Sequence, residues 1–387
     1  MKQLPEQILE NDKIFQEAIE KNMSKDTINF AISEPYFPVP AVIRNTAQDI
    51  ILSGKLNNTS TKGLEKLRVL IAEKFNHSFG SEGVSITVGA SEALYSIVTS
   101  LIETDDEVLI PALRNKNYDA VILLSGGKIR NYKINNKDEK QFTISNIEEK
   151  ITEKTKMIIL NNPLNPTGQI IYFEQMTELA KLCEEKNIYL VVDESYNEIH
   201  FANKKYPTLS GFNEFVIVFT NLSKLFDMSG WRLGWILSSE KIIEKINIIR
   251  KYSVTCAPMI SQQLAINILG GIGDKPSEKI LTILSNRRKL MSETLKKYNL
   301  ESFIVPAGGY YLFFKYSEYL DKPLSSIKFS KMLKKGSDVL TVPGTVFGKS
   351  GEGFIRISFA VDETNIQEGV KKIKEFIDDL NNFKISY

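Results

Sequence analysis

Short apolar runs alternate with amphipathic stretches between about residues 60 and 240. The runs lack regular polar alternation, which is typical of strands that are buried on both faces. They predict strands over 84–88, 107–111, 157–160, 188–193, 215–220 and 234–237. The stretches between them repeat apolar residues with the helical period and predict helices over 62–76, 90–102, 172–186 and 239–252. This alternation indicates an α/β domain with a mostly parallel sheet.

From about residue 277 the pattern changes to that of an α+β domain. A charged helix is predicted over 277–298, and further helices over 325–335 and 363–382. Strands are predicted within "FIVP" (303–306), "GYYLFFK" (309–315), "VLTVP" (339–343) and "FIRISFA" (354–360). We therefore expect a large domain over 41–285, a small domain over 286–387, and an N-terminal segment, 1–40, that packs with the small domain. The polar stretch 135–140 predicts a solvated turn.

Composition narrows the range of partners. Apolar residues make up 42% of the chain, charged residues 25%, and the net charge is +2. These values are typical of globular proteins and give no basic cluster for nucleic acid or an anionic membrane, so we expect small-molecule partners. No apolar run approaches the ~18 residues of a membrane span, and the start of the chain does not resemble a signal peptide. We therefore expect a cytoplasmic protein.

Cysteine and histidine are scarce. Cys183 and Cys256 are too few for a disulfide framework and are expected to be ordinary thiols in a reducing compartment. His77 and His200 are the only histidines, which argues against the common metal sites and against hydrolases that pair a nucleophile with histidine. The chemistry must then depend on lysine, carboxylates, tyrosine or a bound cofactor.

Polar residues follow several of the predicted strands, where α/β proteins bind their ligands. Ala90 and Ser91 open a helix after strand 84–88, which suits a phosphate, although a plain serine cap is the simpler interpretation. Asp193 ends strand 188–193 and is followed by Tyr196. A carboxylate there needs a cation or a donor, and a protonated ring nitrogen would serve, although a helix-capping aspartate fits equally well.

Two further segments complete this set. In "NNPLNPTG" (161–168) the prolines indicate a turn, whereas the amide of Asn165 could donate to a ligand oxygen. After strand 215–220 come Ser223, Lys224 and Arg232, and a lysine between two buried segments is rarely a plain surface charge. One ligand would account for the phosphate donors, the carboxylate, the amide, the phenol and the amine. That ligand is pyridoxal phosphate, held as a Schiff base.

With these residues in place, nearly the whole chain resembles the class I and II aminotransferases of fold type I. The matching segments are "ITVGASEAL" (86–94), "DDEVLIP" (105–111), "NNPLNPTG" (161–168), "VVDESYNEI" (191–199), "SKLFDMSGWRLGW" (223–235), "AGGYYLFF" (307–314) and "GFIRISFA" (353–360). The resemblance implies a large domain with a mostly parallel, seven-stranded sheet flanked by helices, plus a smaller α+β domain. It also implies a homodimer with active sites at the subunit interface.

The resemblance also implies roles for individual residues. Lys224 would form the Schiff base and move the α-proton, and Asp193 would pair with the pyridine nitrogen. Arg356 would grip the substrate α-carboxylate. The residues expected around the remaining cofactor atoms are Tyr196 and Asn165 at the ring hydroxyl, and Ala90, Ser91 and Arg232, with Ser223 nearby, at the phosphate.

Three positions depart from the family pattern. Ser33 stands where the family usually has a glycine near the substrate carboxylate. Asn58 replaces a tyrosine that reaches the partner subunit's phosphate. Asn115 takes the place of an aromatic residue that stacks on the cofactor ring, while Tyr118 is kept. We expect these changes to leave the lysine chemistry intact and to bear on substrate class, cofactor affinity and the level of activity.

The leading hypothesis is therefore an aminotransferase that passes an amino group from an amino acid to a 2-oxo acid, with 2-oxoglutarate as the expected acceptor. A carbon–sulfur β-lyase would use the same residues, and a cofactor-binding regulatory protein is a third possibility. A nicotinamide-dependent dehydrogenase is disfavoured because no predicted strand is followed by GxGxxG.

Overall fold

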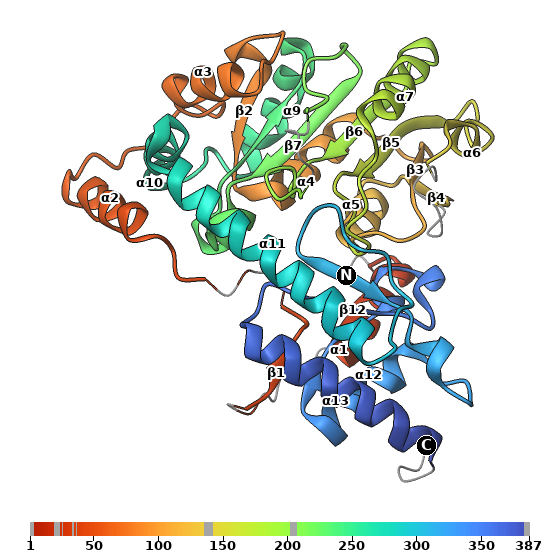
Figure 1. The fold of residues 1–387 in the computed structure, drawn as a ribbon. Helices are drawn as coiled ribbons and strands as arrows, with labels where there is room; N and C mark the ends of the chain where they lie inside the picture. The colour runs from red at the N-terminus through yellow and green to blue at the C-terminus, as the bar shows by residue number, and fades with distance from the viewer. Residues whose placement is uncertain are drawn as a thin grey trace.

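The fold has a large lobe built on a seven-stranded sheet and a small lobe of short strands and helices (Figure 1). A computed structural model describes residues 4–18, 24, 26–32, 35, 37–134, 142–201 and 207–382. The predicted turn at 135–140 lies outside the described residues.

The sheet of the large lobe has the strand order β2-β8-β7-β6-β5-β3-β4. Its strands are β2 (Val84–Thr87), β3 (Glu107–Pro111), β4 (Lys128–Tyr132), β5 (Thr155–Asn161), β6 (Tyr189–Asp193), β7 (Val216–Asn221) and β8 (Gly234–Leu237). Only β8 runs antiparallel to its neighbours in this sheet. The prediction of an α/β fold with a mostly parallel sheet is confirmed.

Helices cover both faces of this sheet because its strands are apolar on both. Val191 packs into one core cluster with α4, α5 and α9, while Leu190 and Val192 pack into another cluster with α3 and α7. The helices of the large lobe are α2 (Ala41–Leu52), α3 (Glu65–Lys74), α4 (Gly89–Leu101), α5 (Asn117–Leu124), α6 (Ile144–Glu148), α7 (Phe173–Glu185), α8 (Ser223–Phe226), α9 (Glu240–Ser253) and α10 (Met259–Asn267).

The small lobe combines segments from both ends of the chain. Its strands are β1 (Ile28–Asn29), β9 (Tyr311–Phe314), β10 (Val339–Leu340), β11 (Val342–Pro343) and β12 (Ile355–Ser358), and its helices are α1 (Glu6–Ala18), α12 (Ser326–Ser337) and α13 (Glu363–Asn381). β1 pairs in parallel with β10, while β11, β12 and β9 form an antiparallel sheet. The long helix α11 (Asp274–Lys297) runs from beside α10 towards α13 (Figure 1). The expected domain boundaries at 40/41 and 285/286 stay predictions.

Two predicted strands of the small domain need correction. "FIVP" does not form a strand, and Phe303 makes only an isolated bridge to Phe314. Pro306 has no N–H to donate, and its carbonyl oxygen accepts a bond from the Arg288 guanidinium instead. "VLTVP" forms two short strands, because its first two residues pair with β1 and Val342–Pro343 pair with β12.

Strand register brings polar side chains to one edge of the large sheet. Asp193, the last residue of β6, lies opposite Asn161 of β5 on one side and Phe219 of β7 on the other. Since these strands are parallel, the residues after them also meet at this edge.

Candidate functional site

A cavity of about 390 Å³ lies at this edge of the large sheet and reaches β12 of the small lobe. It brings together most of the residues that the sequence predicted as a site. Those that line it are Ala90, Ser91, Asn115, Asn165, Asp193, Tyr196, Lys224 and Arg356.

The other predicted residues lie elsewhere or outside the description. Ser33 is not among the described residues, and Ser223 begins α8 but its side chain is not described. Arg232 lies beside the start of α4, outside the cavity lining. Asn58 is exposed, and its Oδ1 atom lies 3.8 Å from the Cys256 sulfur rather than at the cavity of its own chain.

Asp193 is a buried carboxylate with two defined donors. The Tyr118 hydroxyl donates to its Oδ2 atom at 2.6 Å, and the Ser195 backbone N–H donates to Oδ1 at 2.9 Å. Burial raises the pKa of Asp193 above its ordinary value, while these hydrogen bonds and nearby Lys224 oppose the shift. A cationic ring nitrogen at this position would favour the ionised carboxylate.

Lys224 and Tyr196 face the same part of the cavity. The Lys224 ammonium lies 5.7 Å from the centre of the Tyr196 ring. Lys224 sits in α8, directly after β7, so the buried strand fixes the start of the turn that carries it. The Tyr196 hydroxyl is 3.3 Å from that of Tyr311, and burial raises the pKa of Tyr196, which keeps the phenol protonated as a donor.

The start of α4 forms a cradle with Arg232. Gly89 has φ +79°, and a Cβ atom added there would lie 2.8 Å from a guanidinium nitrogen of Arg232. Arg232 itself adopts a left-handed backbone conformation (φ 53°), and its side chain donates to the carbonyl oxygens of Val88 and Ser229. A guanidinium is thereby held beside the N-terminus of a helix, where an anion is favoured.

Arg356 is buried, and several contacts hold its guanidinium in one orientation. Its guanidinium stacks on the Tyr311 ring at 3.8 Å and donates to Asn165 Oδ1 at 3.1 Å. A longer contact, 3.4 Å, joins it to the carbonyl oxygen of Ala31. Its Nε atom is buried and has no hydrogen-bond partner among the described residues. A planar, fixed guanidinium with an unused donor suits a carboxylate ligand.

The residues present fit pyridoxal phosphate. The cradle of Gly89 and Arg232 suits a phosphate, the Asp193 carboxylate suits a protonated ring nitrogen, and Lys224 offers an amine in the same cavity. Asn165 accepts through Oδ1 from Arg356, so its amide nitrogen remains a donor for a ring oxygen.

The structure adds two residues that sequence reasoning did not single out. Tyr311 lines the cavity and contacts both Tyr196 and Arg356. Asn161 accepts from the Asn165 backbone N–H at 2.8 Å and donates to the Asp193 carbonyl oxygen at 2.9 Å, so it ties together the ends of β5 and β6. Both lie in segments that resemble the family, "AGGYYLFF" and "NNPLNPTG", which was the available signal.

Neither a metal-binding cluster nor a membrane-spanning helix is found among the described residues. Within the described parts of the chain, no group of three or more His, Cys, Asp or Glu residues could hold a metal ion. No helix among the same residues has the length and apolar character needed to cross a membrane.

Comparison with known proteins gives consistent matches. The family model "Aminotransferase class I and II" matches residues 25–373. An aspartate aminotransferase of Sulfolobus acidocaldarius is 34% identical over 94% of this chain and 93% of its own length. Aromatic-amino-acid aminotransferase 2 of Thermococcus litoralis is 29% identical, with 90% and 91% covered. The crystal structure of an aromatic aminotransferase from Pyrococcus horikoshii OT3 superposes with a TM-score of 0.86 at 27% identity, covering 95% of this chain and 99% of that one.

Proposed function

Because the chain belongs to the class I and II aminotransferase family, it is a pyridoxal-phosphate-dependent aminotransferase, and we propose that Lys224 both binds the cofactor and moves the substrate proton. The observation that carries this assignment is the shared cavity, which Lys224, Asp193 and Arg356 all line. The Lys224 amine suits the cofactor aldehyde, and the buried Asp193 carboxylate suits the ring nitrogen. The fixed Arg356 guanidinium suits the substrate carboxylate.

The remaining residues bind and orient. When bound, pyridoxal phosphate would supply an aldehyde that accepts the amino group and a ring that withdraws electrons from the substrate. Asp193 holds a proton at the ring nitrogen, and Tyr196 and Asn165 donate to the ring hydroxyl oxygen. Arg356 fixes the substrate α-carboxylate, so that the α-proton faces the Lys224 amine. The phosphate is held by Ala90, Ser91 and Arg232, with Ser223 beside them.

The substrates in this proposal are an amino acid donor and a 2-oxo acid acceptor, each with a second carboxylate, for example aspartate and 2-oxoglutarate. Support comes from the charges that line the cavity. Asp193 is its only acidic lining residue in the described chain, whereas Lys116, Lys224 and Arg356 are basic. Some relatives are named for aspartate and others for aromatic amino acids, so their names alone do not decide whether the substrate has a second carboxylate.

The proposal includes a homodimer in the cytoplasm. Large apolar side chains are exposed on α9 and α2, among them Tyr252 (84% exposed), Leu52 (76%) and Ile248 (60%). A second copy of the chain would cover such surfaces.

Cys183 and Cys256 are both free thiols, which fits a reducing compartment. Cell fractionation tests the location, and recovery of the protein only from an oxidising compartment would contradict it.

The first prediction concerns Lys224. The Lys224→Ala variant should fold, because little core volume is lost, but its amino transfer should fall by several orders of magnitude. After borohydride reduction with pyridoxal phosphate, the native protein should carry a covalent pyridoxyl group at residue 224, detectable by mass spectrometry. The matched control is Lys128→Ala, since Lys128 is exposed and pairs with Asp105 at the surface.

Two outcomes would contradict the proposal. Normal transfer by Lys224→Ala would refute the assignment of the lysine. Steady release of pyruvate and thiol from a cystathionine-like substrate, without a 2-oxo acid acceptor and without amino transfer, would favour the β-lyase.

A further inference from the structure

The loop between β3 and α5 places a lysine in the wall of the cavity. Lys116 lines it together with Asn115 and Asn117, and the Lys116 side chain keeps 24% of its surface exposed. Lys116 is also the residue that precedes α5, where the helix dipole favours an anion. The loop thus lines the cavity with one basic residue and two amide residues.

The charge of Lys116 is not balanced by its neighbours. Its Nζ atom lies 3.1 Å from Asp119 Oδ2. Asp119 is fully buried and already carries a two-pronged ion pair with Arg114, at 2.5 Å from Nε to Oδ1 and 2.8 Å from Nη2 to Oδ2. Two cations therefore share one carboxylate, which leaves a net positive charge at the cavity wall.

Among the contacts of Asp119, the one with Lys116 is the easiest to replace by a contact between Lys116 and another anion. Asp119 Oδ2 is surrounded by four donors, because Gln7 and Asn11 of α1 approach it at 3.4 and 3.3 Å in addition to Arg114 and Lys116. One carboxylate oxygen has about two lone pairs to offer. Burial lowers the pKa of Lys116, with Arg114 and Lys349 acting in the same direction against the attraction of Asp119. A further anion would relieve this excess of positive charge.

Arg114, two residues before Lys116, and Arg356 both contact Phe347 of the small lobe. The backbone N–H of Arg114 donates to the carbonyl oxygen of Phe347 at 3.0 Å. The Phe347 ring lies 5.0 Å from the Arg356 guanidinium carbon. The loop that carries Lys116 and the Arg356 guanidinium are thereby held against the same residue, and both basic groups face one cavity.

From this arrangement we propose that Lys116 is a specificity-determining residue that binds the second carboxylate of a dicarboxylic substrate while Arg356 holds the first. The inference rests on the proposed function, since it assumes that the substrate occupies this cavity. It assigns the selectivity for acidic amino acids to a residue of the same chain. Asp119 and Arg114 then act as positioning residues, because they anchor the loop beneath the lysine.

The test compares Lys116→Gln and Lys116→Arg with the native enzyme and with the surface control Lys128→Gln. The ratio of kcat/KM for aspartate to kcat/KM for phenylalanine should fall about 10- to 100-fold in Lys116→Gln, the effect of losing one charge-assisted hydrogen bond. Lys116→Arg should retain most of the native ratio, and Lys128→Gln all of it. Because the measure is a ratio, a general loss of activity does not affect it.

A binding experiment gives a readout that needs no turnover. Calorimetric titration of the cofactor-loaded protein should show weaker succinate binding in Lys116→Gln, by a similar factor, and no comparable change for propionate. Equal losses for both ligands would overturn the proposal and make Lys116 a structural residue. Loss of pyridoxal phosphate on dialysis, with unchanged succinate selectivity, would also overturn it, because Lys116 would then serve the phosphate. If the native protein transferred no amino group from any donor, the proposed function would fail, and the succinate titration would still decide on Lys116.

Discussion

The side chains near Asn115 are already held by other partners. Arg114 is held by Asp119, by the carbonyl oxygen of Pro111 and by Asn131. Tyr118 points its hydroxyl at Asp193. Arg114 is therefore not placed to cover the cofactor ring, whereas Tyr118 lines the cavity together with Asn115.

We predict that Asn115→Tyr will retain pyridoxamine phosphate longer than the native protein. A stacked aromatic pair contributes about 0.5–1.5 kcal/mol beyond area burial, which corresponds to roughly a two- to tenfold change in affinity. The measurement is cofactor loss on dialysis after reaction with an amino donor, when the cofactor is held by non-covalent contacts alone. Asn286→Tyr, at an exposed position on α11 outside the cavity, serves as the control. Equal retention in all three proteins would show that another part of the cavity covers the ring.

Among single residues, the sequence predicts site residues that stand at the ends of strands. It misses residues whose role depends on neighbours that are distant in sequence. Asp193 and Lys224 could be found because each follows a buried run. Lys116 could not, since a lysine between two asparagines has no feature that separates it from the other basic residues of the chain. Its importance comes from Asp119 and from Phe347, which is distant in sequence.

At the scale of elements, six of the seven strands of the large sheet are predicted to within two residues, because burial on both faces leaves a continuous apolar run. β3 and β8 have the predicted bounds, whereas β4, with the sequence "KIRNY", is an edge strand whose exposed positions hide it. The short strands of the small lobe are harder to predict, because pairing with distant segments, not local pattern, decides where β10 ends and β11 begins.

The exposed apolar faces of α2 and α9 lead to a prediction about assembly. The double variant Leu52→Glu and Tyr252→Glu should shift the protein from dimer to monomer, because it places charges on surfaces that a second copy would bury. Analytical ultracentrifugation over a range of concentrations measures this shift. Leu124→Glu, an exposed leucine at the end of α5, is the control. A dimer of unchanged stability in the double variant would place the subunit interface elsewhere.

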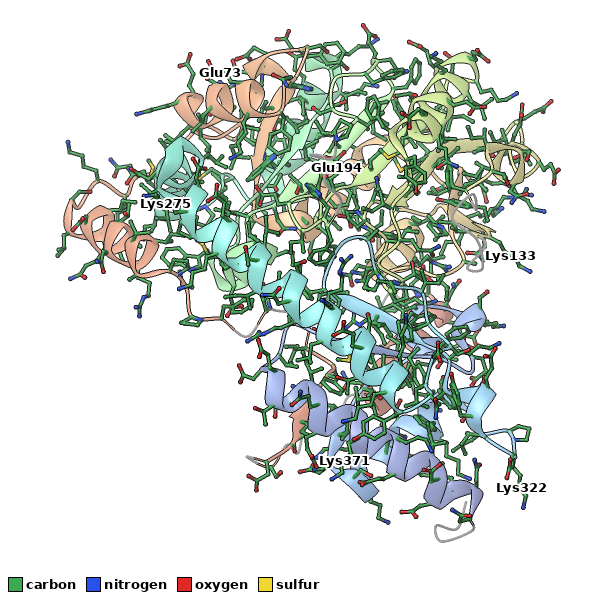
Figure 2. The ribbon with its side chains drawn as sticks, in the orientation of Figure 1. Glu73, Lys133, Glu194, Lys275, Lys322 and Lys371 are labelled. Atoms are coloured by element: carbon green, nitrogen blue, oxygen red, sulfur yellow. The ribbon has the colours of Figure 1, made fainter. Side chains whose placement is uncertain are left out.

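At the scale of the whole molecule, one buried carboxyl makes stability depend on pH. Glu194 lies inside the large lobe (Figure 2), where it accepts from the backbone of Leu209 and from Asn197, both at 3.1 Å. Burial raises the pKa of Glu194 from its ordinary 4.5 to about 7, with hydrogen bonds from Thr208, Leu209 and Asn197 acting in the opposite direction and the neighbouring charge of Asp193 adding to the rise. Between these two values, the folded protein keeps a proton that the unfolded chain has released.

The free energy of unfolding should therefore fall as the pH rises from about 4.5 to about 7, by an amount on the order of 3 kcal/mol. Urea unfolding of the cofactor-free protein at several pH values measures this slope. Glu194→Gln should flatten the slope while lowering stability overall, because glutamine offers one acceptor where Leu209 and Asn197 need two. Glu73→Gln, at an exposed position on α3, should keep the native slope. A native slope in Glu194→Gln would assign the effect to Asp193, whose pKa is also raised by burial.

The pairing of β1 with β10 also governs the order in which the protein can be completed during synthesis. Ile28 can pair with Val339 only after Val339 has been synthesised, roughly 300 residues later. At ordinary elongation rates this takes about 15–60 s. The large lobe, whose strands all lie between residues 84 and 237, can form its sheet during that interval. Ala31, just beyond β1, reaches its place beside Arg356 only after the small lobe has closed. The substrate-binding end of the cavity is thus among the last parts of the chain to be assembled, which would keep a nascent enzyme inactive until translation is nearly finished.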